Sequence, residues 1–265
     1  NRIDLVYHRF SENLGQRDLV GHWMRCLDLT EGEEWVWLFS DDDIMEPACV
    51  AAFYRQLAHD DATDLYHFDP VIIDGKGDLV RVPPGFPASL SATEFFYRKI
   101  NYRLASFAVE YVFRQQALRA MGGFVPFDLA WCSDDATWMT FACRQPIRTV
   151  QGARIHWRAS PINITSQRNN RGLVERKVAM QFRFLRWARR QLQDRGATDR
   201  TTAFQRFRWA VGVLFHSAAF GVAEKARLAT RLAAGVDERP NIGTVCGYLL
   251  WCELKALLRK WLNKR

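Results

Sequence analysis

The chain has 265 residues, and its 48% hydrophobic and 13% aromatic content excludes a disordered protein and allows a sizeable core. No apolar run reaches the ~18 residues that a membrane-spanning helix needs, and the six cysteines include no C-x-x-C pair. We therefore expect reduced, buried thiols in a cytoplasmic protein, and neither a disulfide framework nor a zinc site.

The formal net charge of +8 is divided unevenly along the chain. Residues 1–165 carry 16 Lys or Arg and 22 Asp or Glu, a net charge of −6, whereas residues 166–265 carry 21 and 7, a net charge of +14. This division predicts two parts with different partners: an acidic part that can hold a cation, and a basic part that faces an anionic surface.

The first fifty residues alternate turn, helix and strand signals. Asn13-Leu14-Gly15 is a turn signal, and apolar residues recur at helical spacing over 19–29, with Asp18 as the expected N-cap. The apolar run over 35–39 has the length of a buried strand.

Three consecutive carboxylates, Asp41, Asp42 and Asp43, follow this strand-like run. They are expected at the carboxyl end of the strand, where open α/β sheets bind their ligands. Carboxylates held close together suit Mg²⁺ or Mn²⁺, with a substrate phosphate completing the coordination. The alternative is a solvated acidic turn before a helix that begins near Pro47.

The middle of the chain continues the alternation of strands and helices. We predict strands over residues 65–68, 71–73, 109–113, 147–150 and 153–157, the first two being separated by Pro70. We also predict a hairpin turn over 74–77, a capping box at Ser91–Glu94 that opens a helix through about Lys99, and a short helix over 115–121. This pattern indicates a three-layer α/β sheet.

A second acidic pair, Asp134 and Asp135, lies between Trp131 and Trp138. If Ser133 caps a helix here, both carboxylates occupy its first turn, where the helix dipole favours negative charge, and their role is structural. The aromatic neighbours favour a functional role instead, because partial desolvation raises the pKa of a carboxyl group towards that of a general base.

The last predicted strand leads into His156-Trp157-Arg158. A lone histidine such as His156 is usually a satisfied polar group in or near a core. Arg158 beside it has the geometry to clamp a phosphate.

These segments together resemble glycosyltransferase family 2, nucleotide-sugar-dependent enzymes of the Rossmann-like GT-A fold, and within it the bacterial branch linked to surface-polysaccharide synthesis. The resemblance rests on the order and spacing of five segments: Asn13-Leu14-Gly15, the run 37–47, Gly122-Gly123-Phe124, Ser133-Asp134-Asp135 and His156-Trp157-Arg158. It implies a GT-A-like three-layer α/β domain over 1–165, followed by a basic helical region over 166–265.

The resemblance implies an inverting hexosyltransferase that moves a sugar from a nucleotide-sugar donor to a glycan or lipid-linked acceptor. Asp41, Asp42 and Asp43 stand at the family's D-x-D motif, where the acids hold Mg²⁺ or Mn²⁺ against the donor diphosphate. Asp134-Asp135 stand at the family's Glu-Asp pair, whose second acid deprotonates the acceptor hydroxyl, which makes Asp135 the expected base.

The resemblance also implies which residues contact the donor. Asn13, Gly15 and Asp41 are expected in the nucleotide site, and His156 and Arg158 are expected near the diphosphate. Two features depart from the family pattern. The first two strands, which hold the nucleobase and ribose, are absent, because Asn1 falls where the third strand is expected. The Gln-x-x-Arg-Trp motif of processive synthases is also absent, so we expect transfer of a single sugar.

Basic and apolar residues alternate in a predicted helix over 173–192, and further helices are predicted over 203–232 and 242–262, with breaks at Gly196 and Arg239-Pro240. A basic amphipathic helix suits an anionic membrane surface, which would make this a peripheral protein on the inner face of the cell membrane. The alternative is a helical appendage whose apolar residues pack on the sheet. No recognition motif supports a nucleic-acid partner.

Two other classes of protein stay open. A haloacid-dehalogenase-like, Mg-dependent phosphatase also places Asp-x-Asp after a hydrophobic strand, but Met45 stands where that motif needs Thr or Val. A non-catalytic adaptor would combine a degenerate sugar-nucleotide fold with basic helices that bind a membrane or a partner protein.

Overall fold

The computed structural model describes residues 4–15, 17–60, 62–160, 163–234 and 241–262. Seven strands of this part form one mixed sheet, whose main path has the order β1-β6-β3-β7-β2, with β4 paired to β3 and β5 paired to β7. The strands are β1 (Trp35–Trp37), β2 (Ile44–Met45), β3 (Leu65–Ile73), β4 (Leu79–Arg81), β5 (Ser89–Leu90), β6 (Tyr111–Arg114) and β7 (Ile147–Arg158). The predicted α/β class is therefore confirmed.

Three strands of the sheet run in the same direction. β6 is antiparallel to both β1 and β3, and β3 is parallel to β7. The carboxyl ends of β1, β3 and β7 therefore lie at one edge of the sheet, which is where open α/β sheets place their ligands. The run Asp41 to Asp43 follows β1, and Arg158 ends β7, so both segments reach this edge.

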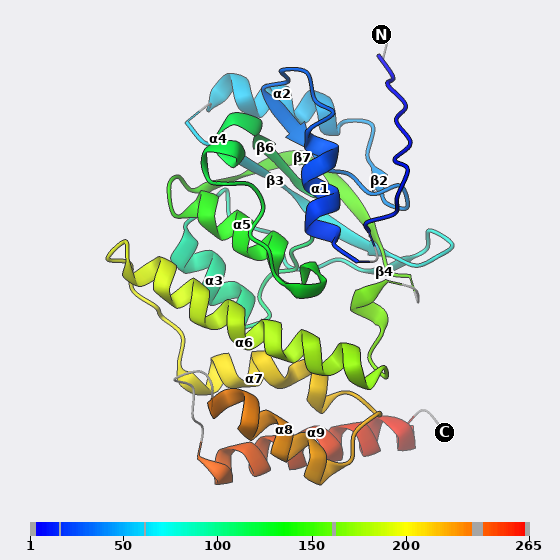
Figure 1. Cartoon of the computed structure of the whole chain (residues 1–265), viewed down its shortest axis with the longest axis vertical. Coiled ribbons are helices and arrows are strands. Elements are labelled where there is room, and N and C mark those ends of the chain that lie inside the picture. Colours follow the sequence, from blue (N-terminus) through cyan, green and yellow to red (C-terminus); the bar gives the residue numbers. More distant parts are fainter. Residues whose placement is uncertain (1–3, 16, 61, 161–162, 235–240, 263–265) are drawn as a thin grey trace.

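Helices cover both faces of the sheet (Figure 1). On one face, Phe53 of α2 packs against Tyr66 of β3, and on the other face α5 contacts β3 and β7. The neighbours Leu65 and Tyr66 belong to two different cores, as expected when successive side chains of a strand point to opposite faces. The helices of this part are α1 (Leu19–Leu27), α2 (Cys49–His59), α3 (Ala92–Ile100), α4 (Gln115–Ala120) and α5 (Ser133–Ala142), with 3-10 turns η1 (Asp128–Ala130) and η2 (Ile164–Ser166).

Two helices begin where the sequence predicts. Asp18 accepts a hydrogen bond from the backbone N–H of Gly21 at the start of α1, and Ser91 accepts one from the N–H of Glu94 at the start of α3. The Glu94 carboxylate does not complete a capping box, because it pairs with Arg98 and Arg200.

Several strand boundaries differ from the prediction. Pro70 lies inside β3, at a point where the pairing with β7 shifts register, so the proline falls at a bulge and does not end the strand. β7 likewise continues through Gly152, whose φ is 88°. β1 ends at Trp37 and is half-buried, not buried, because its described pairing is with β6 alone.

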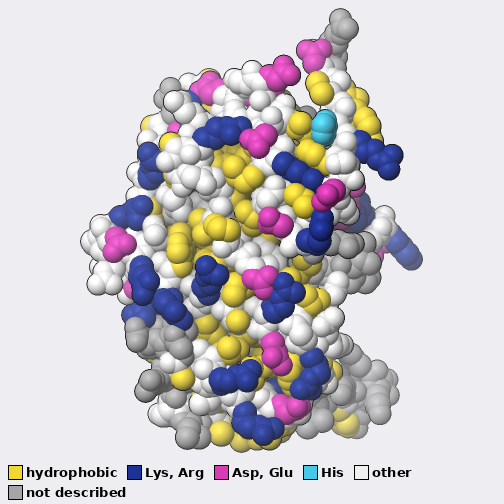
Figure 2. Space-filling model, viewed as in Figure 1, with side chains coloured by type: hydrophobic (Ala, Val, Ile, Leu, Met, Phe, Trp, Pro, Cys, Tyr) yellow, Lys and Arg dark blue, Asp and Glu magenta, His cyan; other side chains and the backbone are white. Residues whose placement is uncertain are grey.

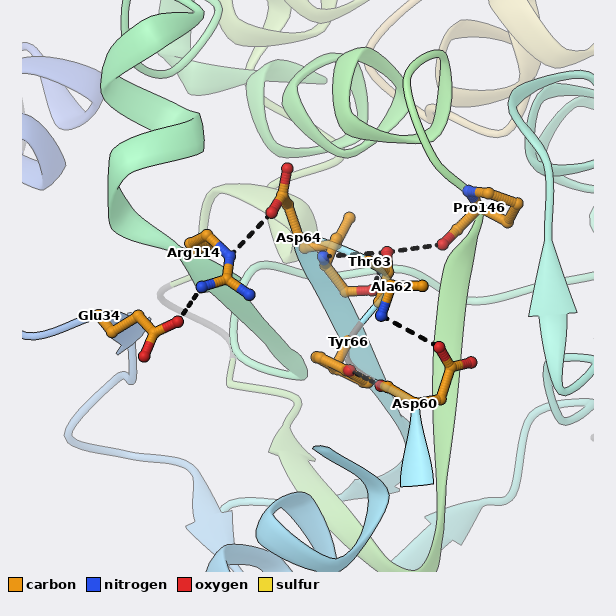
Figure 3. A network of polar contacts seen from close by, with 9 residues as sticks. Glu34, Asp60, Ala62, Thr63, Asp64, Tyr66, Arg114 and Pro146 are labelled. Atoms are coloured by element: carbon orange, nitrogen blue, oxygen red, sulfur yellow. Dashed lines mark hydrogen bonds and ion pairs between the residues drawn. The ribbon is translucent and has the colours of Figure 1, made fainter. Parts of the chain in front are cut away.

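Polar contacts join the amino ends of the strands, away from the carboxyl edge (Figure 3). Arg114 at the end of β6 pairs with Glu34 before β1 and, at 2.9 Å, with Asp64 before β3. Thr63 donates a hydrogen bond of 2.8 Å to the carbonyl oxygen of Pro146 before β7. These contacts tie the three strands together at the end opposite the acidic run, and we assign them a structural role.

The long helix α6 (Arg171–Gln193) lies between the sheet and three further helices (Figure 1). These are α7 (Ala203–Phe215), α8 (Val222–Ala234) and α9 (Ile242–Leu262). The predicted helix over 203–232 is therefore two helices, and the predicted break at Arg239-Pro240 lies outside the described residues. One hydrophobic core extends from the sheet through α6 to α9, so the two sequence regions share a core.

The basic residues of α6 are largely engaged within the protein. Arg176 pairs with Asp128 at 2.5 Å, and Figure 2 shows basic and acidic side chains interleaved over this part of the surface. Lys177 is buried, donates a hydrogen bond to the carbonyl oxygen of Gln167 at 2.9 Å, and has its pKa lowered to about 8 by burial. The apolar residues predicted on this helix are also buried: Val178, Phe182, Leu185 and Leu192. α6 is therefore a helix whose apolar residues pack inside the protein, which was the alternative to a membrane-surface helix.

In the part of the chain that the structure describes, no helix is both long and apolar enough to cross a membrane.

The six cysteines are free thiols, as predicted. The prediction that they are buried is confirmed for Cys49, Cys132 and Cys252, whereas Cys26 and Cys143 are only half-buried. At Cys246 on α9, which is exposed, the prediction was wrong.

Candidate functional site

Asp43 joins the two segments that meet at the carboxyl edge of the sheet. Its Oδ1 accepts a hydrogen bond of 2.7 Å from the backbone N–H of Arg158. Burial raises the pKa of Asp43 to about 6; the charge of Asp42 adds to the rise, while hydrogen bonds from Arg158 and Ser40 oppose it. Burial disfavours the ionised form of this carboxyl group, and a cation that binds beside it would stabilise that form.

Asp41 and Asp42 are exposed in the turn that precedes Asp43. Among the described residues, no group of three His, Cys, Asp or Glu side chains is placed to hold a metal ion. Mg²⁺ commonly takes only one or two carboxylates and completes its shell with water and substrate phosphates. Asp41 and Asp42 are exposed, and burial disfavours the charged form of Asp43 beside them. This arrangement therefore fits a metal ion that binds together with a diphosphate.

The side chains of His156 and Arg158 bind groups of the protein itself. His156 Nε2 lies 3.0 Å from Oε1 of Glu46, and this hydrogen bond is the main cause that lowers the pKa of Glu46. The Arg158 guanidinium donates to the carbonyl oxygens of Asp42, at 2.6 Å, and Asp74, at 2.9 Å. These bonds fasten the acidic turn and the end of β3 to β7. A role of either side chain on a diphosphate stays a prediction.

Asp134 and Asp135 lie in the first turn of α5, as predicted. Contrary to what the structural alternative assumed, Ser133 does not cap the helix: the N-cap is Cys132, with φ of 70°, and Ser133 Oγ accepts the backbone N–H of Phe127. Oδ1 of Asp134 accepts a hydrogen bond of 2.9 Å from the N–H of Asp135.

The two acids have different surroundings. Asp135 is 4% exposed; its Oδ2 lies 2.7 Å from Nζ of Lys99 in α3, and its Oδ1 is buried without a hydrogen-bond partner. Burial, and then the charge of Asp135, raise the pKa of Asp134 well above its ordinary range. For Lys99, burial lowers the pKa, but the charges of Asp135 and Asp134 outweigh burial and raise it overall. Asp135 is thus neutralised by an internal cation, whereas Asp134 readily takes up a proton.

The loop before β6 connects the two acidic groups. Phe107 stacks on Trp157 of β7 with ring centroids 4.1 Å apart, and the carbonyl oxygen of Val109 accepts a 2.6 Å hydrogen bond from Trp37 of β1. Glu110 in the same loop is fully buried, and burial raises its pKa well above the ordinary range, with the charge of Asp134 adding to the rise. The loop therefore contacts β1, which precedes the acidic run, and β7, which ends at Arg158, and its Glu110 is close enough to Asp134 to feel that charge.

Sequence reasoning missed three charged residues of this region: Glu46, Lys99 and Glu110. Glu110 carries a usable signal, because it is a lone charge inside the apolar run over 109–113. Glu46 and Lys99 carry none, because their partners, His156 and Asp135, come from distant segments that only the fold brings together.

Asn13 and Gly15 form the predicted turn, in which Asn13 Oδ1 accepts a hydrogen bond of 2.9 Å from the N–H of Gly15. Within the described residues, no hydrogen bond or ion pair joins this turn to Asp43 or to the acid pair. Their assignment to a nucleotide site stays a prediction.

No protein-family model matches the sequence of this chain, and neither does any curated protein. The candidate site consists of the acidic run after β1, which lies beside the end of β7, and a second, partly buried acid pair at the start of α5.

Proposed function

We propose that this chain is an inverting glycosyltransferase with a GT-A-like sheet, which uses Mg²⁺ or Mn²⁺ to move a sugar from a nucleotide-sugar to a glycan or lipid-linked acceptor. The observation that carries the proposal is Asp43, a half-buried carboxyl group with its pKa raised to about 6 at the carboxyl edge of the sheet. We place the reaction in the cytoplasm, in the synthesis of a surface polysaccharide.

The donor side of the proposed site consists of Asp43 with Asp41 or Asp42. These carboxylates would hold the metal ion, which when bound offsets the negative charge that develops on the leaving diphosphate. The Arg158 backbone N–H fixes the orientation of Asp43 through its 2.7 Å hydrogen bond. Exposed carboxylates beside it leave room for donor oxygens to complete the coordination.

The acceptor side consists of Asp134 and Asp135. One carboxylate takes the proton of the acceptor hydroxyl while that oxygen forms a bond to the anomeric carbon. The bond from this carbon to the diphosphate oxygen breaks, and the nucleoside diphosphate leaves with the electron pair. Attack from the face opposite the leaving group inverts the anomeric centre.

The described conformation favours the carboxylate of Asp134 over that of Asp135 as the group that receives this proton. Both oxygens of Asp135 are occupied or buried, since Oδ2 pairs with Lys99 and Oδ1 is enclosed. Asp134 is half-buried, and its raised pKa suits a general base that works near neutral pH. Asp135 then holds Lys99, and its negative charge adds to the burial that raises the pKa of Asp134.

The test is release of nucleoside diphosphate from a panel of UDP-, GDP- and dTDP-sugars with Mn²⁺. Asp134→Asn is expected to slow release by at least ~100-fold, since a general base contributes about that much. Asp69→Asn, an acid outside the site whose side chain binds the Phe86 backbone N–H, serves as the control. Full activity of Asp134→Asn, or equal activity with EDTA, would contradict the proposal.

A further inference from the structure

The last helix, α9, is apolar on the side that faces solvent. Five side chains on this side are between 48% and 61% exposed: Leu250, Trp251, Leu254, Leu258 and Leu262. Their spacing of three and four residues places them along one side of the helix. A helix with apolar residues on this side as well as on its packed side normally has both sides covered.

The opposite side of α9 is fixed to the rest of the protein. Val245, Leu249 and Cys252 are at most 4% exposed and belong to the continuous core. Glu253 pairs with the buried Lys225 of α8 at 2.5 Å. The exposed side therefore belongs to a helix held by its own core contacts, and it lies at the end of the molecule farthest from the sheet (Figure 1). Hydrophobic side chains appear along this lower end in Figure 2.

The charge around this helix favours an anionic occupant. Residues 255–265 contain five Lys or Arg and no Asp or Glu. In the described structure Lys255 lies over the ring of Trp251, with Nζ 3.9 Å from the ring centroid, beside the apolar side. Helices that lie in the interface of an anionic membrane typically combine Leu and Trp on one side with Lys and Arg beside them.

A hollow of about 450 Å³ opens beside the same helix, between α7 and α9. Its lining includes the rings of Phe204, Tyr248 and Trp251, together with Arg208, whose Nε is buried without a hydrogen-bond partner. Mobile acyl chains can enter an aromatic hollow of this kind, and Arg208 as a whole is only half-buried, so the oxygen atoms of a lipid headgroup are acceptors for the part of its guanidinium group that is not enclosed.

We propose that the exposed side of α9 lies in the interface of an anionic lipid bilayer and docks the protein on it. For the basic helix over 173–192 the sequence left two alternatives open, membrane contact and packing on the sheet. The apolar residues of α6 are buried, so we assign the membrane contact to α9. A second copy of the chain fits less well. Within α9 itself, Glu253 is the one carboxylate, and it is already paired with Lys225, so the described residues of this helix offer no unpaired acid to receive the cations of another copy.

The experiment is flotation of the purified full chain with vesicles of phosphatidylcholine containing about 30% phosphatidylglycerol, without nucleotide. The unmodified chain is expected to float with these vesicles and to bind pure phosphatidylcholine less. The double variant Leu254→Glu, Leu258→Glu is expected to lose binding by about tenfold or more, because two charges replace the apolar surface. No nucleotide is present, so the result is independent of the proposed transferase activity.

The matched control is Leu79→Glu, Val80→Glu on β4. These two apolar residues are exposed and lie far from α9 in the sequence, and the two substitutions change the net charge by the same amount. Circular dichroism checks that both variants fold; Leu254→Ser, Leu258→Ser is the substitute if the charged variant does not. Equal loss in the β4 control, or no loss in either α9 variant, would overturn the proposal. So would a concentration-dependent dimer that the α9 substitution dissolves while vesicle binding is absent.

Discussion

Asp43 carries its negative charge in a half-buried position, and this has a consequence for stability. Its pKa rises from the ordinary 3.8 to about 6 in the folded protein, so between these values the folded chain binds a proton more tightly than the unfolded chain. The free energy of unfolding contributed by Asp43 therefore falls as the pH rises from about 4 to about 6.

Asp43→Asn should lack this fall, because asparagine keeps the acceptor for the Arg158 N–H but carries no charge. We expect the variant to be more stable than the parent by about 1 kcal/mol at pH 7 in EDTA, a value discounted for partial exposure. Urea unfolding at several pH values measures this difference. Parallel pH profiles for the two proteins would show that the burial of Asp43 has no energetic effect.

Lys99 is the cation that permits Asp135 to be buried. Lys99→Met should destabilise the protein by about 3 kcal/mol, because it leaves a buried carboxylate without a partner. The double variant Lys99→Met, Asp135→Asn removes both charges and should recover most of that loss. Chemical denaturation of the two variants measures this difference. If Lys99→Met alone is as stable as the double variant, the interaction between Lys99 and Asp135 does not stabilise the protein.

At this scale, the sequence predicts where carboxylates lie but not what they contact. Three acids after a strand and two acids at a helix start follow from local patterns. The pairing of Asp135 with Lys99 and of His156 with Glu46 joins residues from segments far apart in the chain. No local pattern encodes such pairs, because they depend on how the helices and strands pack.

At the scale of elements, α6 holds the sheet and the last helices together. Phe184 is fully buried and its ring lies 6.2 Å from that of Phe96 in α3 and 5.6 Å from that of Trp209 in α7, centroid to centroid. Phe184→Ala should therefore cost about 3–5 kcal/mol of unfolding free energy. The adjacent Arg183 is exposed, and Arg183→Ala should cost less than about 1 kcal/mol. Thermal unfolding of both variants compares them; similar losses would contradict the central position of Phe184.

Helical periodicity and capping residues predict the helices better than turn residues predict the strand breaks. Asp18 and Ser91 cap helices as expected because a cap acts over only three residues. Pro70 was expected to separate two strands, and the strands over 147–150 and 153–157 were expected to be distinct. Pairing between β3 and β7 instead keeps each pair of segments in one strand, with a register shift at Pro70 and a positive φ at Gly152. Interactions with other strands decide such cases, and they are not visible in a local window.

At the scale of the whole molecule, the shared core predicts cooperative unfolding. The charge asymmetry suggested two parts, 1–165 and 166–265, but the same buried cluster contains residues of the sheet, α6, α7 and α9. Calorimetry should therefore show one transition, with equal calorimetric and van't Hoff enthalpies. Two resolved transitions, or a stably folded fragment of residues 1–165, would show that the parts are independent.

The central claim is a metal-dependent donor site at Asp43. Isothermal titration of UDP, GDP and dTDP into the chain, with Mn²⁺ and separately with EDTA, tests it most directly. We predict that one of these nucleotides binds with Mn²⁺, that EDTA abolishes the binding, and that Asp43→Asn abolishes it as well. Absence of binding for all three nucleotides with Mn²⁺, or binding that neither EDTA nor Asp43→Asn alters, would contradict the assignment.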